Sequence, residues 1–179
     1  MRVVVFILVA GCTGQVWGFG TGAGTCDVVA DFSTITAMGS RNRNQHTGPF
    51  TLVADTAFYN STDFVEITLS GAPFTGIVIS VVDENGSKVG TFDFNSETQV
   101  QECDGNAMAV THTSTHGSVS NRSMFWIPPA EPVGTVYVLA YVLSGQRGDQ
   151  GSQQFYRFVR DDLSAVVIQS EVIFAAGFD

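Results

Sequence analysis

Short apolar runs separated by turn residues fill the chain from Pro49 onward, and this pattern constrains the fold more than any other feature. Runs of this length suit β-strands, and regular turn signals between them are typical of a β-sandwich. Glycine and β-branched residues are plentiful while lysine is rare, as expected of a strand-and-turn protein. The sequence therefore predicts an all-β fold. The expected strands are Phe50–Ala54, Phe64–Leu69, Ile77–Asp83, Lys88–Phe92, Thr98–Cys103, Met108–Thr113, Ser123–Ile127, Thr135–Leu143 and Gln154–Val159.

Two of these strands allow sharper predictions. Alternation over Phe64–Leu69 places Phe64, Glu66 and Thr68 on one face and three aliphatic residues on the other. Thr135–Leu143 is nearly all apolar, which indicates a central strand buried on both faces.

The connections and the tail are less regular. Asn85-Gly86 predicts a type I′ hairpin turn, which needs positive φ at both positions. Within the C-terminal tail, residues 161–179, the segment Leu163–Ile168 is compatible with an edge strand or a short helix. No internal repeat or linker divides the chain, so one domain over residues 19–160 is expected.

The first 18 residues have the pattern of a signal peptide. A charged start at Arg2 precedes the apolar run Val3–Ala10, and cleavage is expected after Gly18, with Gly14 as the alternative. The run is too short for a membrane span, which needs about 20 residues. Two other interpretations are a buried first strand and a bacterial lipobox that would lipidate Cys12. The favoured interpretation is a secreted protein.

Two cysteines, Cys26 and Cys103, remain once Cys12 leaves with the signal peptide. An even pair in an oxidising compartment favours a disulfide, and the spacing fits no zinc motif. Closing a loop of about 78 residues stabilises a fold by roughly 4 to 4.5 kcal/mol in the chain-entropy model. No metal or cofactor is expected.

Three N-x-Ser/Thr sequons begin at Asn60, Asn85 and Asn121, each in a predicted turn. A glycan on a turn projects into water, so these asparagines are candidate N-glycosylation sites of a secreted glycoprotein.

The formal net charge of −9 limits the partners of the chain. Removing residues 1–18 removes Arg2 and no acid, so the mature charge is 7 − 17 = −10. No two of the remaining basic residues are adjacent. Nucleic acids and polyanionic glycans are therefore poor partners, because they bind clustered Lys and Arg.

A series of short motifs, in a fixed order, resembles the reeler (reelin N-terminal) domain family. Each motif alone is weak evidence for the family, whereas their order along the chain is specific to it. They are Cys26, Pro49-Phe50, Tyr59 with Leu69-Ser-Gly71, Phe74-Thr-Gly76, Gly90-Thr-Phe92, Cys103, Val110-Thr-His-Thr113 and Trp126-Ile-Pro128.

The resemblance implies an immunoglobulin-like antiparallel β-sandwich with Cys26 bonded to Cys103. The segment after Cys26 lacks the proline- and histidine-containing run of many members, and a second cysteine pair found in some members is absent.

The histidines offer little for catalysis. His112 and His116 are four residues apart in a strand-and-loop context, so they do not share a helix face. Ser114 and Asp104 could form a triad with His112, but no nucleophile elbow or oxyanion motif accompanies them. A hydrogen-bonded structural imidazole near the disulfide is the favoured role of His112, and the chain is not expected to be an enzyme.

Aromatic residues favour binding instead. Trp126, Tyr137 and Tyr141 are expected to pack between the sheets. Alternation puts Phe155 opposite Tyr156 and Phe158, so at least one of these rings should be exposed for stacking on sugars unless the tail covers it. Arg147-Gly-Asp149 is either an integrin-binding tripeptide or, as favoured, a simple turn.

By resemblance the chain is similar to small secreted invertebrate defence proteins that consist of one reeler domain. The expected function is innate defence through binding of microbial glycans or lipids, with antibacterial activity as a further expectation. Recognition or agglutination is favoured over lysis because the chain is acidic. The alternative is an extracellular-matrix or adhesion module. A role in ferric reduction is the least favoured interpretation, since no haem ligands or membrane helices are evident in the sequence.

Overall fold

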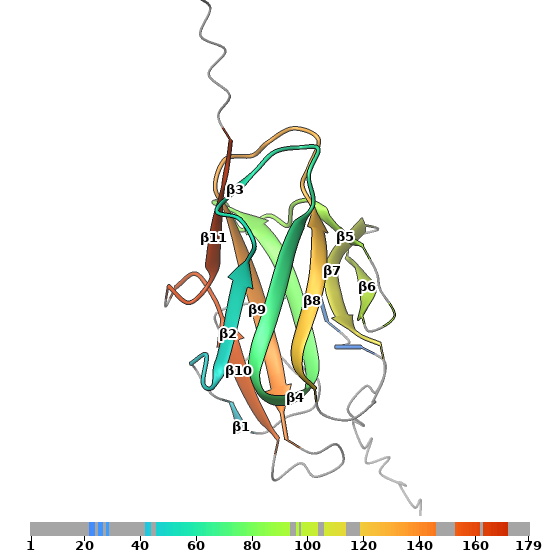
Figure 1. Cartoon of the computed structure of the whole chain (residues 1–179), viewed down its shortest axis with the longest axis vertical. Coiled ribbons are helices and arrows are strands. Elements are labelled where there is room, and N and C mark those ends of the chain that lie inside the picture. Colours follow the sequence, from blue (N-terminus) through green and yellow to red (C-terminus); the bar gives the residue numbers. More distant parts are fainter. Residues whose placement is uncertain are drawn as a thin grey trace, which may run out of the picture.

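The computed structural model describes residues 22–23, 25–26, 28, 42–43, 46–93, 96, 98–103, 106–113, 119–145, 153–161 and 163–171. These residues form strands, turns and bends, with no helix among them (Figure 1). The all-β prediction is confirmed. The strands are β1 (Asn42–Arg43), β2 (Phe50–Ala54), β3 (Phe58–Tyr59), β4 (Val65–Asp83), β5 (Thr91–Asp93), β6 (Thr98–Cys103), β7 (Asn106–His112), β8 (Val119–Ile127), β9 (Val136–Ser144), β10 (Gln154–Phe158) and β11 (Val166–Ser170).

The strands form two packed layers. One layer has the order β2-β4-β8-β5, and the other has the order β1-β10-β9-β4-β7-β6. Strand β11 pairs with β9 on the same side as β10, farther along the strand. Nearly all pairs are antiparallel, and the two exceptions, β1 with β10 and β3 with β11, involve two residues each. The fold is therefore a β-sandwich of the expected immunoglobulin-like kind.

Strand β4 belongs to both layers. Its first half pairs with β2 and β8, and its second half pairs with β9 and β7. In Figure 1 it runs away from one end of the sandwich, bends at the other end and returns. The register shifts between Ser70 and Phe74, and Gly71 lies there at φ 140°. The sequence predicted two strands because the glycine and proline between them resemble a turn, whereas the ladder continues through the bend.

The main core lies between the layers. Val65, Ile67 and Leu69 of β4 are at most 1% exposed, while Glu66 and Thr68 between them are half-buried, as the alternation predicts. Across the core lie inward residues of β9, β10 and the second half of β4. Phe50 contacts Tyr156 edge-to-face, with ring centroids 5.0 Å apart.

A second apolar cluster covers the outer face of the β10-β9-β4-β7 layer. Tyr141 and Phe155 pack there with Ala23 and Val28 of the N-terminal segment. Strand β9 is therefore buried on both faces, which confirms the prediction for this segment.

The predicted type of the hairpin turn at Asn85-Gly86 needs correction. Asn85 has no positive φ, since Leu163 is the only non-glycine residue of the described part of the chain with one, so the turn is not type I′. The Gly86 amide bonds to the Asp83 carbonyl at 3.1 Å, and Gly86 has φ 84°. This is a type I-like turn followed by a left-handed glycine, the usual three-residue hairpin loop. The Asp83 carboxylate favours it by accepting the amides of Asn85 and Ser87, both at 2.8 Å.

The tail contributes a strand to the sandwich. Of the two alternatives, edge strand or short helix, the structure has the strand β11, and its Ile168 is fully buried in the main core. Lys88 forms only an isolated bridge to Val82, so β5 is shorter than the predicted Lys88–Phe92 strand.

Candidate binding surface at one end of the sandwich

Two connections meet at one end of the sandwich. The β3–β4 connection, residues 60–64, and the β8–β9 connection, residues 128–135, extend over the end where β2 finishes and β4 begins (Figure 1). In sandwich folds such end loops are held by a rigid scaffold and commonly carry binding residues. This end is therefore the candidate functional surface of the domain.

Tyr59 joins the two connections. Its hydroxyl donates to the Gly134 carbonyl at 3.0 Å and accepts from the Val133 amide at 3.0 Å. The Ser170 amide of β11 also donates to Gly134, at 3.1 Å. Burial raises the pKa of the Tyr59 hydroxyl, and the hydrogen bond from Val133 offsets part of this rise. Tyr59 therefore stays neutral at physiological pH and can donate to Gly134.

The Trp126 ring packs against the Tyr59 ring. The two rings meet edge-to-face, with centroids 5.3 Å apart and an interplanar angle of 75°. The indole Nε1 of Trp126 donates to the Val89 carbonyl at 3.0 Å. Both side chains are at most 2% exposed, so the predicted core position of Trp126 is confirmed. The end connections consequently rest on a fixed aromatic pair.

Asn60 organises the β3–β4 connection. Its Oδ1 accepts hydrogen bonds from the Thr62 amide and hydroxyl, both at 2.8 Å, and from the Asp63 amide at 3.0 Å. Its Nδ2 donates to the Asp63 carboxylate at 2.7 Å. This asparagine-centred turn fixes the backbone just before Phe64.

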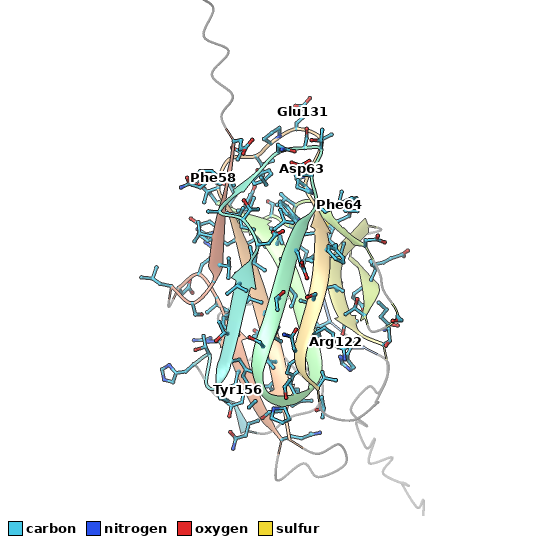
Figure 2. All side chains as sticks on the ribbon, viewed as in Figure 1. Phe58, Asp63, Phe64, Arg122, Glu131 and Tyr156 are labelled. Carbon is cyan, nitrogen blue, oxygen red and sulfur yellow. The ribbon has the colours of Figure 1, made fainter. Side chains whose placement is uncertain are left out.

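Three apolar side chains are exposed at this end. Phe58 is 51% exposed, Phe64 61% and Val133 41%. Figure 2 shows Phe58, Phe64, Asp63 and Glu131 at this same end. Large exposed apolar groups at one end of a fold mark that end as a candidate interaction site. We call Phe58, Asp63, Phe64, Glu131 and Val133 the end surface.

The end surface is negatively charged. Asp63 and Glu131 are exposed, as are Asp55 at the end of β2 and Glu171 after β11. The segments 54–64 and 128–135 contain no lysine or arginine. The local potential is therefore negative, which repels phosphates and sulfates.

The three predicted ligand-binding aromatics lie elsewhere and are buried. Phe155 is 4% exposed, Tyr156 9% and Phe158 4%, so none can stack on a sugar. The alternation was right, since Phe155 faces the opposite side from the other two. Tyr156 and Phe158 face the main core, and Phe155 packs in the second cluster, edge-to-face with Tyr141.

The other predicted aromatic positions are partly confirmed. Tyr141 is fully buried, although in the second cluster and not between the layers. Tyr137 is only half-buried, and the guanidinium of Arg160 lies 4.4 Å from its ring centroid.

Cys26 is disulfide-bonded. Its sulfur lies 3.2 Å from the carbonyl oxygen of Glu102, the residue that precedes Cys103. A bonded sulfur carries no proton, so this is a contact and not a hydrogen bond. The side chain of Cys103 lies outside the described residues, and its pairing with Cys26 stays a prediction.

His112 has structural contacts. The Ile77 amide donates to its Nδ1 at 3.2 Å, and the Thr111 hydroxyl lies 3.3 Å from the same atom. The imidazole is hydrogen-bonded, as expected, and its place near the disulfide stays a prediction. The triad candidates Asp104 and Ser114 lie outside the described residues, as do His116, Cys12 and the tripeptide at residues 147–149. Within the described part of the chain, no three His, Cys, Asp or Glu side chains gather into a possible metal site.

The three sequons differ in their surroundings. Asn60 and Asn85 lie in turns, as predicted, but Asn121 lies within β8, opposite Ser70 of β4. The local preference of Asn and Ser for turns is overridden here by pairing along the β4 edge. The prediction of a turn at Asn121 was wrong.

The two layers, with one strand shared between them and Tyr59 packed on Trp126, define the chain as an immunoglobulin-like β-sandwich domain. The sequence matches the profile of the Reeler domain over residues 33–148, and the chain belongs to this family.

Three solved structures share this fold. Two are of the human F-spondin reeler domain: one is 22% identical, covers 73% of this chain and 94% of its own, and has a TM-score of 0.55. The other is 21% identical, covers 74% of this chain and 94% of its own, and has a TM-score of 0.57. A third structure, of the Reelin-N domain of F-spondin, is 22% identical, covers 73% of this chain and 91% of its own, and has a TM-score of 0.54. No protein with a curated function matches the chain.

No stretch of the described residues forms a helix with the length and hydropathy that a membrane crossing requires.

Sequence reasoning did not identify the end surface. One signal was available, since the alternation of β4 already placed Phe64 on the polar face with Glu66 and Thr68. Phe58 had no comparable signal, because β3 has only two residues and no readable period.

Proposed function

We propose that this reeler domain is a secreted, non-catalytic recognition protein that binds microbial surface glycans through the end surface. The observation that carries the proposal is the exposure of Phe58 and Phe64 at the same end of the sandwich as the exposed carboxylates of Asp63 and Glu131. An extracellular-matrix or adhesion role is the alternative outcome of the test below.

The chemistry of the end surface suits a sugar. An exposed phenyl ring offers an apolar face to the C–H groups of a pyranose. Ionised carboxylates accept hydrogen bonds only, and sugar hydroxyls can donate them. Sites of this type combine apolar contact area with a few polar groups that fix orientation.

The charge of the end surface selects among microbial glycans. Its carboxylates have no neighbouring Lys or Arg in segments 54–64 and 128–135. Phosphate-rich lipopolysaccharide and sulfated heparin are therefore disfavoured, because like charges repel. Uncharged polymers such as β-glucan are favoured. Killing by membrane disruption is also disfavoured, since it usually requires a cationic surface.

Two features support an extracellular location. The N-terminal residues have the pattern of a signal peptide, and Cys26 is disulfide-bonded. Disulfides persist in oxidising compartments and are rare in the cytosol.

A pull-down with washed ligands tests the proposal. The purified protein is incubated with insoluble β-glucan, peptidoglycan, lipopolysaccharide-coated beads, heparin beads and beads coated with matrix proteins, and the bound fraction is measured. We expect binding to β-glucan that is lost in the double variant Phe58→Ala, Phe64→Ala. Leu163→Ala, which removes a side chain that is 92% exposed in the β10–β11 loop, is the matched control and should bind normally. Binding to heparin or matrix proteins alone would overturn the proposal in favour of the adhesion role.

A further inference from the structure

The outer face of the β2-β4-β8-β5 layer contains a sequon that the proposed function does not use. In β8, Asn121, Ser123 and Phe125 alternate with inward residues and share this outer face. Met124 and Trp126, their neighbours in the strand, are fully buried in the main core. Asn121 is exposed, and Phe125 is 41% exposed.

Asn121 is free to carry a modification. The structure gives its side-chain amide no hydrogen bond to another described residue. Asn60 differs, because four hydrogen bonds hold its amide within the β3–β4 connection. Asn85 is exposed in the hairpin loop next to Gly86, where a Cβ atom would meet nothing within 4 Å. A glycan on Asn85 would thus project into solvent, whereas one on Asn121 starts on a flat sheet face.

The surface between Asn121 and Phe125 has only short side chains. Ser70 lies opposite Asn121, and Thr68 lies opposite Ser123 with their hydroxyl oxygens 3.1 Å apart. Glu66 lies opposite Phe125. Asn121 and Phe125 are four residues apart, or about 13 Å along the strand, which is within reach of the first sugars of an N-linked glycan. These sugars would lie over hydroxyl groups and end on an exposed aromatic ring.

We propose that Asn121 is N-glycosylated and that its glycan lies along β8 and covers Phe125. In the transfer step, Nδ2 of Asn121 bonds to C1 of the first sugar of a lipid-diphosphate-linked oligosaccharide. The bond between C1 and the diphosphate oxygen breaks, the amide loses one proton, and the lipid diphosphate leaves. The proposal depends on passage through a glycosylating secretory compartment and is independent of what the end surface binds.

Site occupancy is the first test. The full chain is expressed with its own N-terminal residues in a eukaryotic secretory host. Peptide mapping after N-glycosidase treatment then reads each occupied asparagine as aspartate. We expect Asn121 in its glycosylated form in most of the secreted protein. Secreted protein with an unmodified Asn121 would overturn the proposal.

A double-mutant cycle tests where the glycan lies. Asn121→Gln should lower the thermal midpoint by about 2–4 °C in the Phe125 background and by much less in the Phe125→Ala background. The control pair, Asn85→Gln with Phe125→Ala, should be additive, because the Asn85 turn is not part of this face. Equal shifts for Asn121→Gln in both backgrounds would show a glycan that leaves Phe125 uncovered, contrary to the proposal.

Discussion

The Tyr59 hydroxyl donates to the Gly134 carbonyl at 3.0 Å, although 75 residues separate the two in the sequence. The same hydroxyl accepts from the Val133 amide, so one side chain holds the β8–β9 connection against β3. This buried side chain therefore supports the exposed residues of the end surface.

Replacing Tyr59 by phenylalanine should lower the free energy of unfolding by about 1–3 kcal/mol, because the Val133 amide and Gly134 carbonyl lose a partly buried partner. Urea unfolding measures the loss. Tyr137→Phe is the control, since that ring is half-buried beside Arg160, and it should change stability by less than about 0.5 kcal/mol. Equal effects of the two variants would contradict the role given to Tyr59.

Tyr59 should also make stability depend on alkaline pH. Burial raises its folded-state pKa above the unfolded value of 10.0. The native state therefore keeps the Tyr59 proton to higher pH than the unfolded state does. The contribution of this hydroxyl to the free energy of unfolding is complete below pH 10.0 and is lost as pH rises through the folded-state pKa. Unfolding measured from about pH 9 to about pH 11 should show a steeper loss in the wild type than in Tyr59→Phe. Parallel curves would exclude this contribution.

Gly71 should not tolerate a side chain. It lies at φ 140°, and a Cβ there would collide with the Pro49 carbonyl oxygen and lie 2.9 Å from the Phe50 Cα. Gly71→Ala is expected to cost about 3 kcal/mol or more, because backbone atoms must move. Gly86→Ala has the same left-handed strain but open space, and it should cost only about 1–2 kcal/mol. Chemical denaturation measures both variants. Comparable losses of unfolding free energy for Gly71→Ala and Gly86→Ala would mean that the bend in β4 can relax.

Asn60 should stabilise the fold even without a glycan. Asn60→Ala in protein from a non-glycosylating host removes four hydrogen bonds from the β3–β4 connection and should cost about 1–2 kcal/mol. Asn85→Ala in the same host is the control and should change little, since its side chain makes one long bond of 3.4 Å. An unchanged midpoint for Asn60→Ala would show that the connection holds without its central side chain.

The disulfide at Cys26 should contribute strongly to stability. If Cys26 pairs with Cys103 as predicted, Cys26→Ser opens a loop of about 78 residues and should cost roughly 4 kcal/mol. Reductant should lower the thermal midpoint of the wild type and leave Cys26→Ser unchanged. Non-reducing peptide mapping identifies the partner, and a Cys26 fragment linked to any peptide without Cys103 would refute the pairing.

The core could be predicted from the sequence because its signals are local. Phe50, Tyr59 and Trp126 occur in motifs that resemble the reeler family, and all three are buried. The β4 alternation likewise gave the inward face of that strand. Tyr59 and Trp126, both from these motifs, therefore support the end surface and are not part of it.

What could not be predicted depends on segments far apart in the chain. Alternation predicted the face on which Phe155 lies, but only the fold shows that this face carries a second apolar cluster, which includes Ala23 and Val28. Similarly, Asn85-Gly86 suits two hairpin turns, and the Asp83 carboxylate selects between them. The end surface itself forms only when the β3–β4 and β8–β9 connections meet over Tyr59.

The affinity of the purified domain for a soluble β-glucan oligosaccharide, measured by titration calorimetry, tests recognition at the end surface most directly. Phe64→Ala should weaken binding at least about tenfold, a loss of about 1.4 kcal/mol, while Leu163→Ala should leave it unchanged. Equal affinities of wild type and Phe64→Ala, or no binding by the wild type, would contradict the account.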